Sequence, residues 1–125
     1  MLPFLLFSLG GTLGFVVDST SYYLLSQLLP AFCARFLSFF LAVLTTWFFN
    51  RTLTFSKRRN LPIIKEFTYY LNSMLIGGMA NYIVFLILIA KVDLFEKNPI
   101  FAIAIGSIVG LIFNFTLAKY VVFKK

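Results

Sequence analysis

The sequence is poor in the side chains that bind metals and catalyse reactions. It has no histidine, a single cysteine at position 33, and four Asp and Glu residues among 125. One cysteine excludes an intrachain disulfide, and the lack of histidine excludes a Cys/His catalytic pair or an ordinary zinc site. Four scattered carboxylates do not suggest paired acid–base chemistry, and no Walker-type or dinucleotide-binding glycine loop is present. We therefore expect no enzymatic activity, no cofactor and no bound metal.

Charge of either sign is also scarce. Charged residues make up 12% of the chain and hydrophobic residues 61%, whereas a soluble domain averages about 25% charged residues. So little charge cannot cover a water-exposed surface, and a bilayer is the solvent that such a chain requires. One membrane span takes roughly 20 apolar residues. The composition therefore predicts an all-α membrane protein with four transmembrane helices in a single transmembrane domain over residues 1–125.

The boundaries of the four apolar segments follow from prolines and charges. The first segment has no Lys or Arg before Arg35 and is longer than the apolar core of a signal peptide, so we interpret it as a retained helix. Pro30 ends this segment, and charged connections separate the later ones. The expected helices lie at about 4–29, 32–50, 67–90 and 100–118, with a basic loop at 51–66.

The basic residues predict the orientation of these helices. The 51–66 loop holds five Lys and Arg residues and the C-terminal end holds three, whereas the 91–99 connection is charge-balanced. Basic loops stay on the cytoplasmic side, so we expect a multi-pass protein of the cytoplasmic (inner) membrane with both termini inside. The cluster at 57–59 is interpreted as a topogenic signal, with contact to anionic lipids or a partner as the alternative. Because the net charge of +7 is explained in this way, we expect no nucleic-acid partner.

A weak internal repeat relates the ends of the second and fourth helices at a spacing of 68 residues. Ala34 corresponds to Ala102, and the series Trp47, Arg51, Phe55 corresponds to Phe115, Lys119, Phe123. Aromatic, cation and aromatic side chains at i, i+4 and i+8 share one helix face, and both kinds are typical of the membrane interface. We predict two parallel two-helix repeats related by an axis along the membrane normal.

Small residues four apart indicate where helices approach closely. Such pairs allow backbone contact where lipid provides no hydrophobic driving force. They favour packing inside one bundle, with a homodimer interface as the alternative; the pairs are Gly10/Gly14, Ser73/Gly77 and Gly106/Gly110.

Asp18 is an acid inside the first apolar segment. A charge at the centre of a membrane helix costs about 2.5–3.5 kcal/mol on insertion scales, so Asp18 needs a partner or a water-filled cavity. Arg35 is the nearest cation in the same half of the membrane once Pro30 folds the two helices antiparallel. Two interpretations stay open: a pair that only staples the hairpin, or a polar lining for a translocation path.

Four further polar residues lie near the expected cytoplasmic interface: Asn50, Arg51, Asn114 and Lys119. An Asn in hydrocarbon needs a hydrogen-bond partner, so one interpretation is that the two Asn residues connect helices. The alternative is that all four converge on an anionic head group such as a lipid phosphate.

These features together resemble the GtrA-like family of small four-helix membrane proteins. The resemblance rests on FLLFSLGGTLGFVVD (Phe4–Asp18), ARFLSFFLAVLTTWFFNRTLTF (Ala34–Phe55) and the fainter NFTLAKYVVF (Asn114–Phe123), and it covers nearly the whole chain. Two positions depart from the pattern. Thr46 stands where the family often has Asn, and Ala118 stands where the first half has Asn50, so the two halves keep complementary parts of the motif.

The resemblance implies movement of a polyprenyl-phosphate-linked sugar across the cytoplasmic membrane, for cell-surface polysaccharide synthesis or O-antigen modification. Arg51 and Lys119 would capture the phosphate, and Asp18 and Arg35 would line the outer half. The main alternative is an accessory anchor for a polyprenyl-phosphate glycosyltransferase, since similar segments occur fused to dolichol-phosphate-mannose-type synthases. A small multidrug or cation exporter is less favoured, because Asp18 is the only deep acid. Four helices enclose little volume, so we expect a homodimer in contact with membrane lipids.

Overall fold

The structure is a computed structural model that describes residues 1–58 and 60–124, with Glu96, Pro99 and Ile100 described by their backbone alone. Arg59 of the basic loop and Lys125 of the tail lie outside the described residues. Throughout the described part the secondary structure is helical, with no strand. Four of the helical stretches are long and apolar enough to cross a membrane, as the composition predicts.

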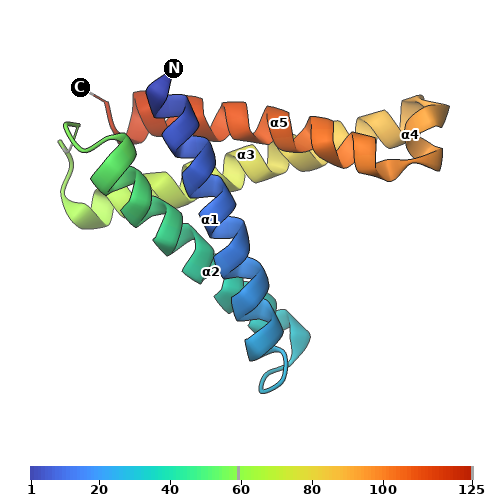
Figure 1. Cartoon of the computed structure of the whole chain (residues 1–125), viewed down its shortest axis with the longest axis horizontal. Coiled ribbons are helices and arrows are strands. Elements are labelled where there is room, and N and C mark those ends of the chain that lie inside the picture. Colours follow the sequence, from blue (N-terminus) through green and yellow to red (C-terminus); the bar gives the residue numbers. More distant parts are fainter. Residues whose placement is uncertain (59, 125) are drawn as a thin grey trace. The chain divides into compact units, whose positions relative to one another are not determined.

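The elements follow one another as two helical hairpins (Figure 1). Two of the long α-helices, α2 and α5, each continue into a short π-helix. In chain order the elements are α1 (Leu2–Leu25), α2 (Ala31–Phe49), the π-helix η1 (Asn50–Thr54), α3 (Ile63–Lys91), the short α4 (Asp93–Lys97), α5 (Pro99–Leu117) and the π-helix η2 (Ala118–Val122).

All four prolines lie where a long helix begins. Pro3 and Pro99 occupy the first turn of α1 and α5, and Pro30 and Pro62 directly precede α2 and α3. The first turn is the one place where a helix does not need the N–H that proline lacks, and the fixed φ of proline suits helix entry. The prolines in the sequence therefore mark where each of the four long helices begins.

The helix ends differ from the expected bounds. Helix α1 ends at Leu25 rather than at 29, and residues 26–30 form the turn. The second span continues through η1 to Thr54, and α3 starts at Ile63. The basic loop is therefore shorter than 51–66, because Arg51 at one end and Glu66 at the other are helical. The 91–99 connection also contains a helix, α4, that the charge pattern does not indicate.

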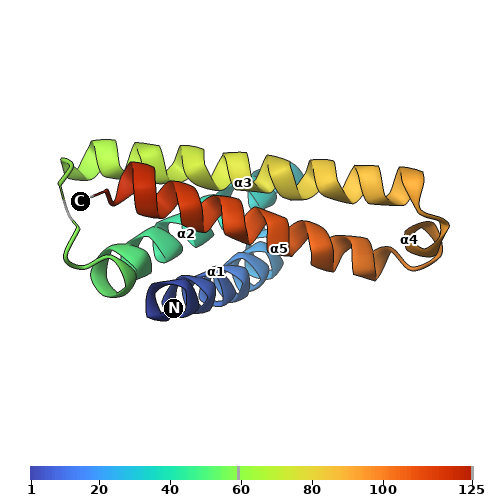
Figure 2. The ribbon, with the colours of Figure 1, turned by 90° about the horizontal axis from the view of Figure 1, so that it is seen from above.

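The chain divides into two compact units, Met1–Arg59 and Asn60–Lys125, and the single transmembrane domain stays a prediction. In the first unit α1 and α2 run side by side as an antiparallel hairpin (Figure 1). In the second unit α3 and α5 do the same, with α4 at the tip of the hairpin (Figure 2). The parallel relation between the two halves stays a prediction.

Small residues bring the helices of each hairpin together. A Cβ on Gly14 would collide with the Thr46 side chain, and a Cβ on Gly77 would collide with the Asn114 amide. A Cβ on Gly110 would lie 2.9 Å from the Gly77 backbone oxygen. These residues therefore pack inside the hairpins, which confirms the first of the two interpretations of the small-residue pairs.

Most large apolar side chains point outward. Leu, Ile and Phe residues along all four long helices are exposed, and the buried set is small. In water such a surface would drive aggregation, whereas in a bilayer the lipid tails cover it. The distribution is that of a multi-pass membrane protein.

Candidate functional site

Asp18 and Arg35 form an ion pair in the first hairpin. The Arg35 guanidinium donates from Nη1 to Asp18 Oδ2 at 2.7 Å, which joins α1 to α2. The Asp18 side chain is 17% exposed and the Arg35 side chain 60% exposed. The burial of the pair is therefore unequal: the Asp18 carboxylate is mostly buried, and the Arg35 guanidinium is mostly exposed.

The second carboxylate oxygen of Asp18 is also informative. Asp18 Oδ1 is buried and accepts no hydrogen bond within residues 1–58 and 60–124. A buried charged oxygen without a hydrogen bond is costly. The position therefore suits a water molecule or a ligand hydroxyl. Both interpretations of Asp18 stay open: an ion pair that links the two helices, and a polar lining of a translocation path.

Both hairpins end in a π-helical turn of the same form. The Phe55 N–H donates to the Asn50 carbonyl at 2.8 Å, and the Phe123 N–H donates to the Ala118 carbonyl at 2.8 Å. These i→i+5 bonds define η1 and η2, which lie 68 residues apart. Single π-helical turns are rare in proteins, and where they occur they often lie at functional sites.

The second residue of each π-helix is a cation that lies over an aromatic ring. The Arg51 guanidinium carbon is 5.6 Å from the Trp47 ring centroid, and Lys119 Nζ is 5.7 Å from Phe115 and 4.9 Å from Tyr120. Such contacts contribute about 0.5–1 kcal/mol at exposed sites and more when desolvated. They confirm the predicted i, i+4 part of the repeat in both halves.

The last aromatic residue of each series, Phe55 or Phe123, does not lie on the helix face that carries the cation. Phe55 is 3% exposed and packs edge-to-face on Phe7, and Phe123 is 0% exposed and packs edge-to-face on Tyr70. The prediction of interfacial aromatics at these two positions is wrong. The wider π turn shifts the following residue around the helix, and each helix ends at that residue.

The two predicted Asn residues have different surroundings. Asn50 is buried, and its Oδ1 accepts a hydrogen bond from Thr54 Oγ1 at 2.7 Å within the same helix end. Asn114 lies against Gly77 of the neighbouring helix, and its Oδ1 is buried without a hydrogen bond among the described residues. Asn114 therefore has a polar atom left for a ligand or water, close to the packing contact of its own hairpin.

The structure thus places the six predicted site residues in three local groups. Asp18 and Arg35 form one group, Asn50 and Arg51 a second, and Asn114 and Lys119 a third; the last two groups lie in different units. Convergence of the second and third groups on one head group stays a prediction.

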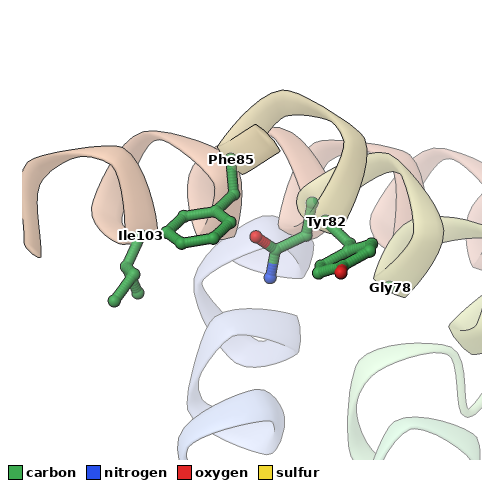
Figure 3. Close-up of a pocket in the computed structure, with 5 residues that line it drawn as sticks. Gly78, Tyr82, Phe85 and Ile103 are labelled. Atoms are coloured by element: carbon green, nitrogen blue, oxygen red, sulfur yellow. The ribbon is translucent and has the colours of Figure 1, made fainter. Parts of the chain in front are cut away.

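Two features were missed by the sequence reasoning. Glu66, counted as a loop acid, lies in the first turn of α3 and is fully buried; its place four residues after Pro62 is the signal, because acids favour a helix N-terminus. The second hairpin also contains a hollow of about 360 Å³ lined by Gly78, Asn81, Tyr82, Phe85 and Ile103 (Figure 3).

Four apolar helices in two hairpins define a small multi-pass membrane protein, in which an ion pair joins α1 to α2 and a cation lies near the end of each hairpin. The family described as the GtrA/DPMS transmembrane domain matches residues 6–123, so the chain belongs to that family. A search of curated proteins gave no match to the chain. Membership supports a role in handling lipid-linked sugars or in polysaccharide synthesis.

Proposed function

We propose that the protein moves a polyprenyl-phosphate-linked monosaccharide across the cytoplasmic membrane. The observation that carries the proposal is the pair of π-helical ends, η1 and η2, each presenting a cation braced on an aromatic ring. Together with the family membership, these ends supply the positive charge that the phosphate of such a lipid requires.

The cations suit phosphate for a physical reason. A sugar and a phosphate must cross about 30 Å of hydrocarbon in which unpaired polar groups are very costly. Arg51 offers a planar guanidinium that binds phosphate oxygens in pairs, and Lys119 offers a compact point charge. Because each cation lies over a ring, its position is restricted before a ligand arrives. Less conformational freedom is then lost on binding.

Asp18 and Arg35 provide a second polar site for the phosphate along the proposed path. Under the predicted orientation the pair lies in the outer half of the membrane, since α1 starts on the cytoplasmic side and Asp18 follows 16 residues after Leu2. The exposed guanidinium is free to bind phosphate while Asp18 holds it in place. A lipid phosphate would therefore meet one cation at the inner rim and another in the outer half. A homodimer would enclose this path better than one chain.

The test is transport in liposomes. Purified protein should speed the movement of short-chain polyprenyl phosphates carrying labelled glucose, galactose or mannose between leaflets, for at least one sugar. Arg51→Gln and Lys119→Gln should each lower that rate about tenfold or more, because hydrogen bonds to charged groups contribute about 1.5–3 kcal/mol. Lys57→Gln removes an exposed loop cation and serves as the control, with the wild-type rate expected. Thermal melts of each variant separate loss of transport from loss of fold.

Two results would overturn the proposal. One is a leaflet-crossing rate equal to that of empty liposomes for every sugar. The other is normal transport in both Arg51→Gln and Lys119→Gln. If the wild type moves nothing but co-purifies with a polyprenyl-phosphate glycosyltransferase and raises its activity, the protein is an accessory anchor instead.

A further inference from the structure

Two packing contacts of the first hairpin recur at matching positions in the second hairpin. The Phe7–Phe55 rings lie 6.4 Å apart at 62°, and the Tyr70–Phe123 rings lie 6.2 Å apart at 61°. The first helices of the two hairpins therefore correspond at a spacing of 63 residues and the second helices at 68. A second contact follows the same spacings. Gly14 packs against Thr46 in the first hairpin, and the corresponding Gly77 packs against Asn114 in the second.

This correspondence places the hollow of the second hairpin where the first hairpin has its ion pair. Asp18 corresponds to Asn81, and Arg35 corresponds to Ile103. Both Asn81 and Ile103 line the hollow, as does Gly78, which stands in the place of Phe15. Gly78 and Ile103 are smaller than Phe15 and Arg35, which stand at the corresponding positions of the first hairpin.

The lining of the hollow combines aromatic rings with an amide. Figure 3 shows the Tyr82 and Phe85 rings projecting from α3 to the same side, with the Ile103 side chain beside Phe85. The side-chain amide of Asn81 makes no hydrogen bond to any of the described residues. It is held in place by packing, because its Oδ1 lies 2.5 Å from the position that a Cβ on Gly106 would occupy.

We propose that this hollow binds the sugar ring of the transported lipid, a proposal that rests on the proposed function. None of the described lining residues is cationic, which makes the hollow a poor site for phosphate. An amide offers two donors and one acceptor, which matches neighbouring sugar hydroxyls, and the C–H face of a pyranose ring stacks on an aromatic ring. A volume of about 360 Å³ lies within the range of about 300–1,000 Å³ for small-molecule sites.

The position of the hollow fits the path. Tyr82 lies nine residues before Lys91, the last residue of α3, or roughly 14 Å along the helix axis. With the predicted orientation the hollow lies in the outer half of the membrane.

The test compares a lipid with and without its sugar. The full chain in lipid nanodiscs is titrated with citronellyl phosphate and with citronellyl phosphate linked to glucose, galactose or mannose, and Kd is measured for each. The wild type should bind at least one glycosylated form more tightly than the bare phosphate. Asn81→Ala should lower that preference about three- to tenfold, the effect of one or two hydrogen bonds, with the Kd of bare citronellyl phosphate unchanged. Asn72→Ala, an exposed amide on the same helix, is the matched control.

A second variant fills the hollow without removing a polar group. Gly78 has no atom within 4 Å of an added Cβ, so Gly78→Phe restores the ring that the first hairpin has at Phe15. This variant should abolish the preference for the glycosylated lipid. Gly11 is equally open in the first hairpin, and Gly11→Phe should leave the preference intact.

The outcomes separate this proposal from the proposed function. If the wild type binds no citronellyl phosphate of any kind, the proposed function fails and this inference fails with it. If both lipids bind equally well, or if Asn81→Ala and Gly78→Phe keep the preference, the sugar site alone is wrong. If the two variants weaken both lipids equally, the hollow binds the prenyl chain and the sugar assignment is overturned.

Discussion

The two hairpins have similar packing contacts but differ in the side chains at matched positions. At matched positions the first hairpin has the Asp18–Arg35 ion pair, and the second has Asn81 and Ile103 beside a hollow. The first has Thr46 against Gly14, and the second has Asn114 against Gly77. The edge-to-face ring pair and the π-helical end therefore occur in both hairpins, whereas the side chains at the matched positions differ in charge and size.

The first test of this comparison is the orientation of the two hairpins in the membrane. Parallel repeats require the Lys57 loop and the Lys125 end on the cytoplasmic side and the Glu96 connection outside. Reporter fusions at these three positions should give inside, inside and outside. An external reading at Lys57 would remove the basis for treating the two hairpins as equivalent.

The ion pair gives the largest expected effect on stability. Arg35→Gln leaves Asp18 charged and mostly buried, so we expect a loss of about 3 kcal/mol, the lower end for breaking a buried pair. Asp18→Asn leaves only the exposed guanidinium unpaired and should cost less, because Arg35 is 60% exposed. The double variant should recover part of the loss.

Thermal melts of the three variants in detergent measure these differences. Additive losses in the double variant would show that the two charges do not interact. Equal losses in the two single variants would contradict the unequal burial of the pair.

A smaller effect is expected from the helix spacing. Gly110 corresponds to Ala42 of the first hairpin, but a Cβ on Gly110 would lie 2.9 Å from both the Gly77 oxygen and the Asn81 Cβ. Gly110→Ala should therefore destabilise the protein by about 1–3 kcal/mol through overpacking. Gly78→Ala, where space is open, is the control, and its melting temperature should not fall. A neutral Gly110→Ala would mean that the two hairpins are equally spaced.

Much of this architecture could be predicted from the sequence. Low charge and long apolar segments give the four spans, and the turn at Pro30 brings Asp18 within reach of Arg35. The π-helical ends could not be predicted, because an i→i+5 turn leaves no residue pattern distinct from an α-helix. The inward Phe55 and Phe123 depend on those turns, so their burial was missed as well.

The hollow was missed for a different reason. It exists because a glycine at Gly78 and an isoleucine at Ile103 come together across a hairpin, and neither residue is unusual in a membrane helix. Only the register between α3 and α5 shows that these two stand opposite the amide of Asn81. Sequence alone gives the composition of each helix, whereas the register requires the packing contacts at Gly77 and Gly110.

The most direct test of the correspondence between the two hairpins is to move the ion pair from one hairpin to the other. Asn81→Asp and Ile103→Arg together should recreate the Asp18–Arg35 contact in the second hairpin. In thermal melts the double variant should be more stable than the sum of the single effects predicts by about 0.5–3 kcal/mol, and it should no longer prefer the glycosylated lipid. Additive effects, with the preference for the sugar intact, would show that the two positions are not equivalent and would contradict the account.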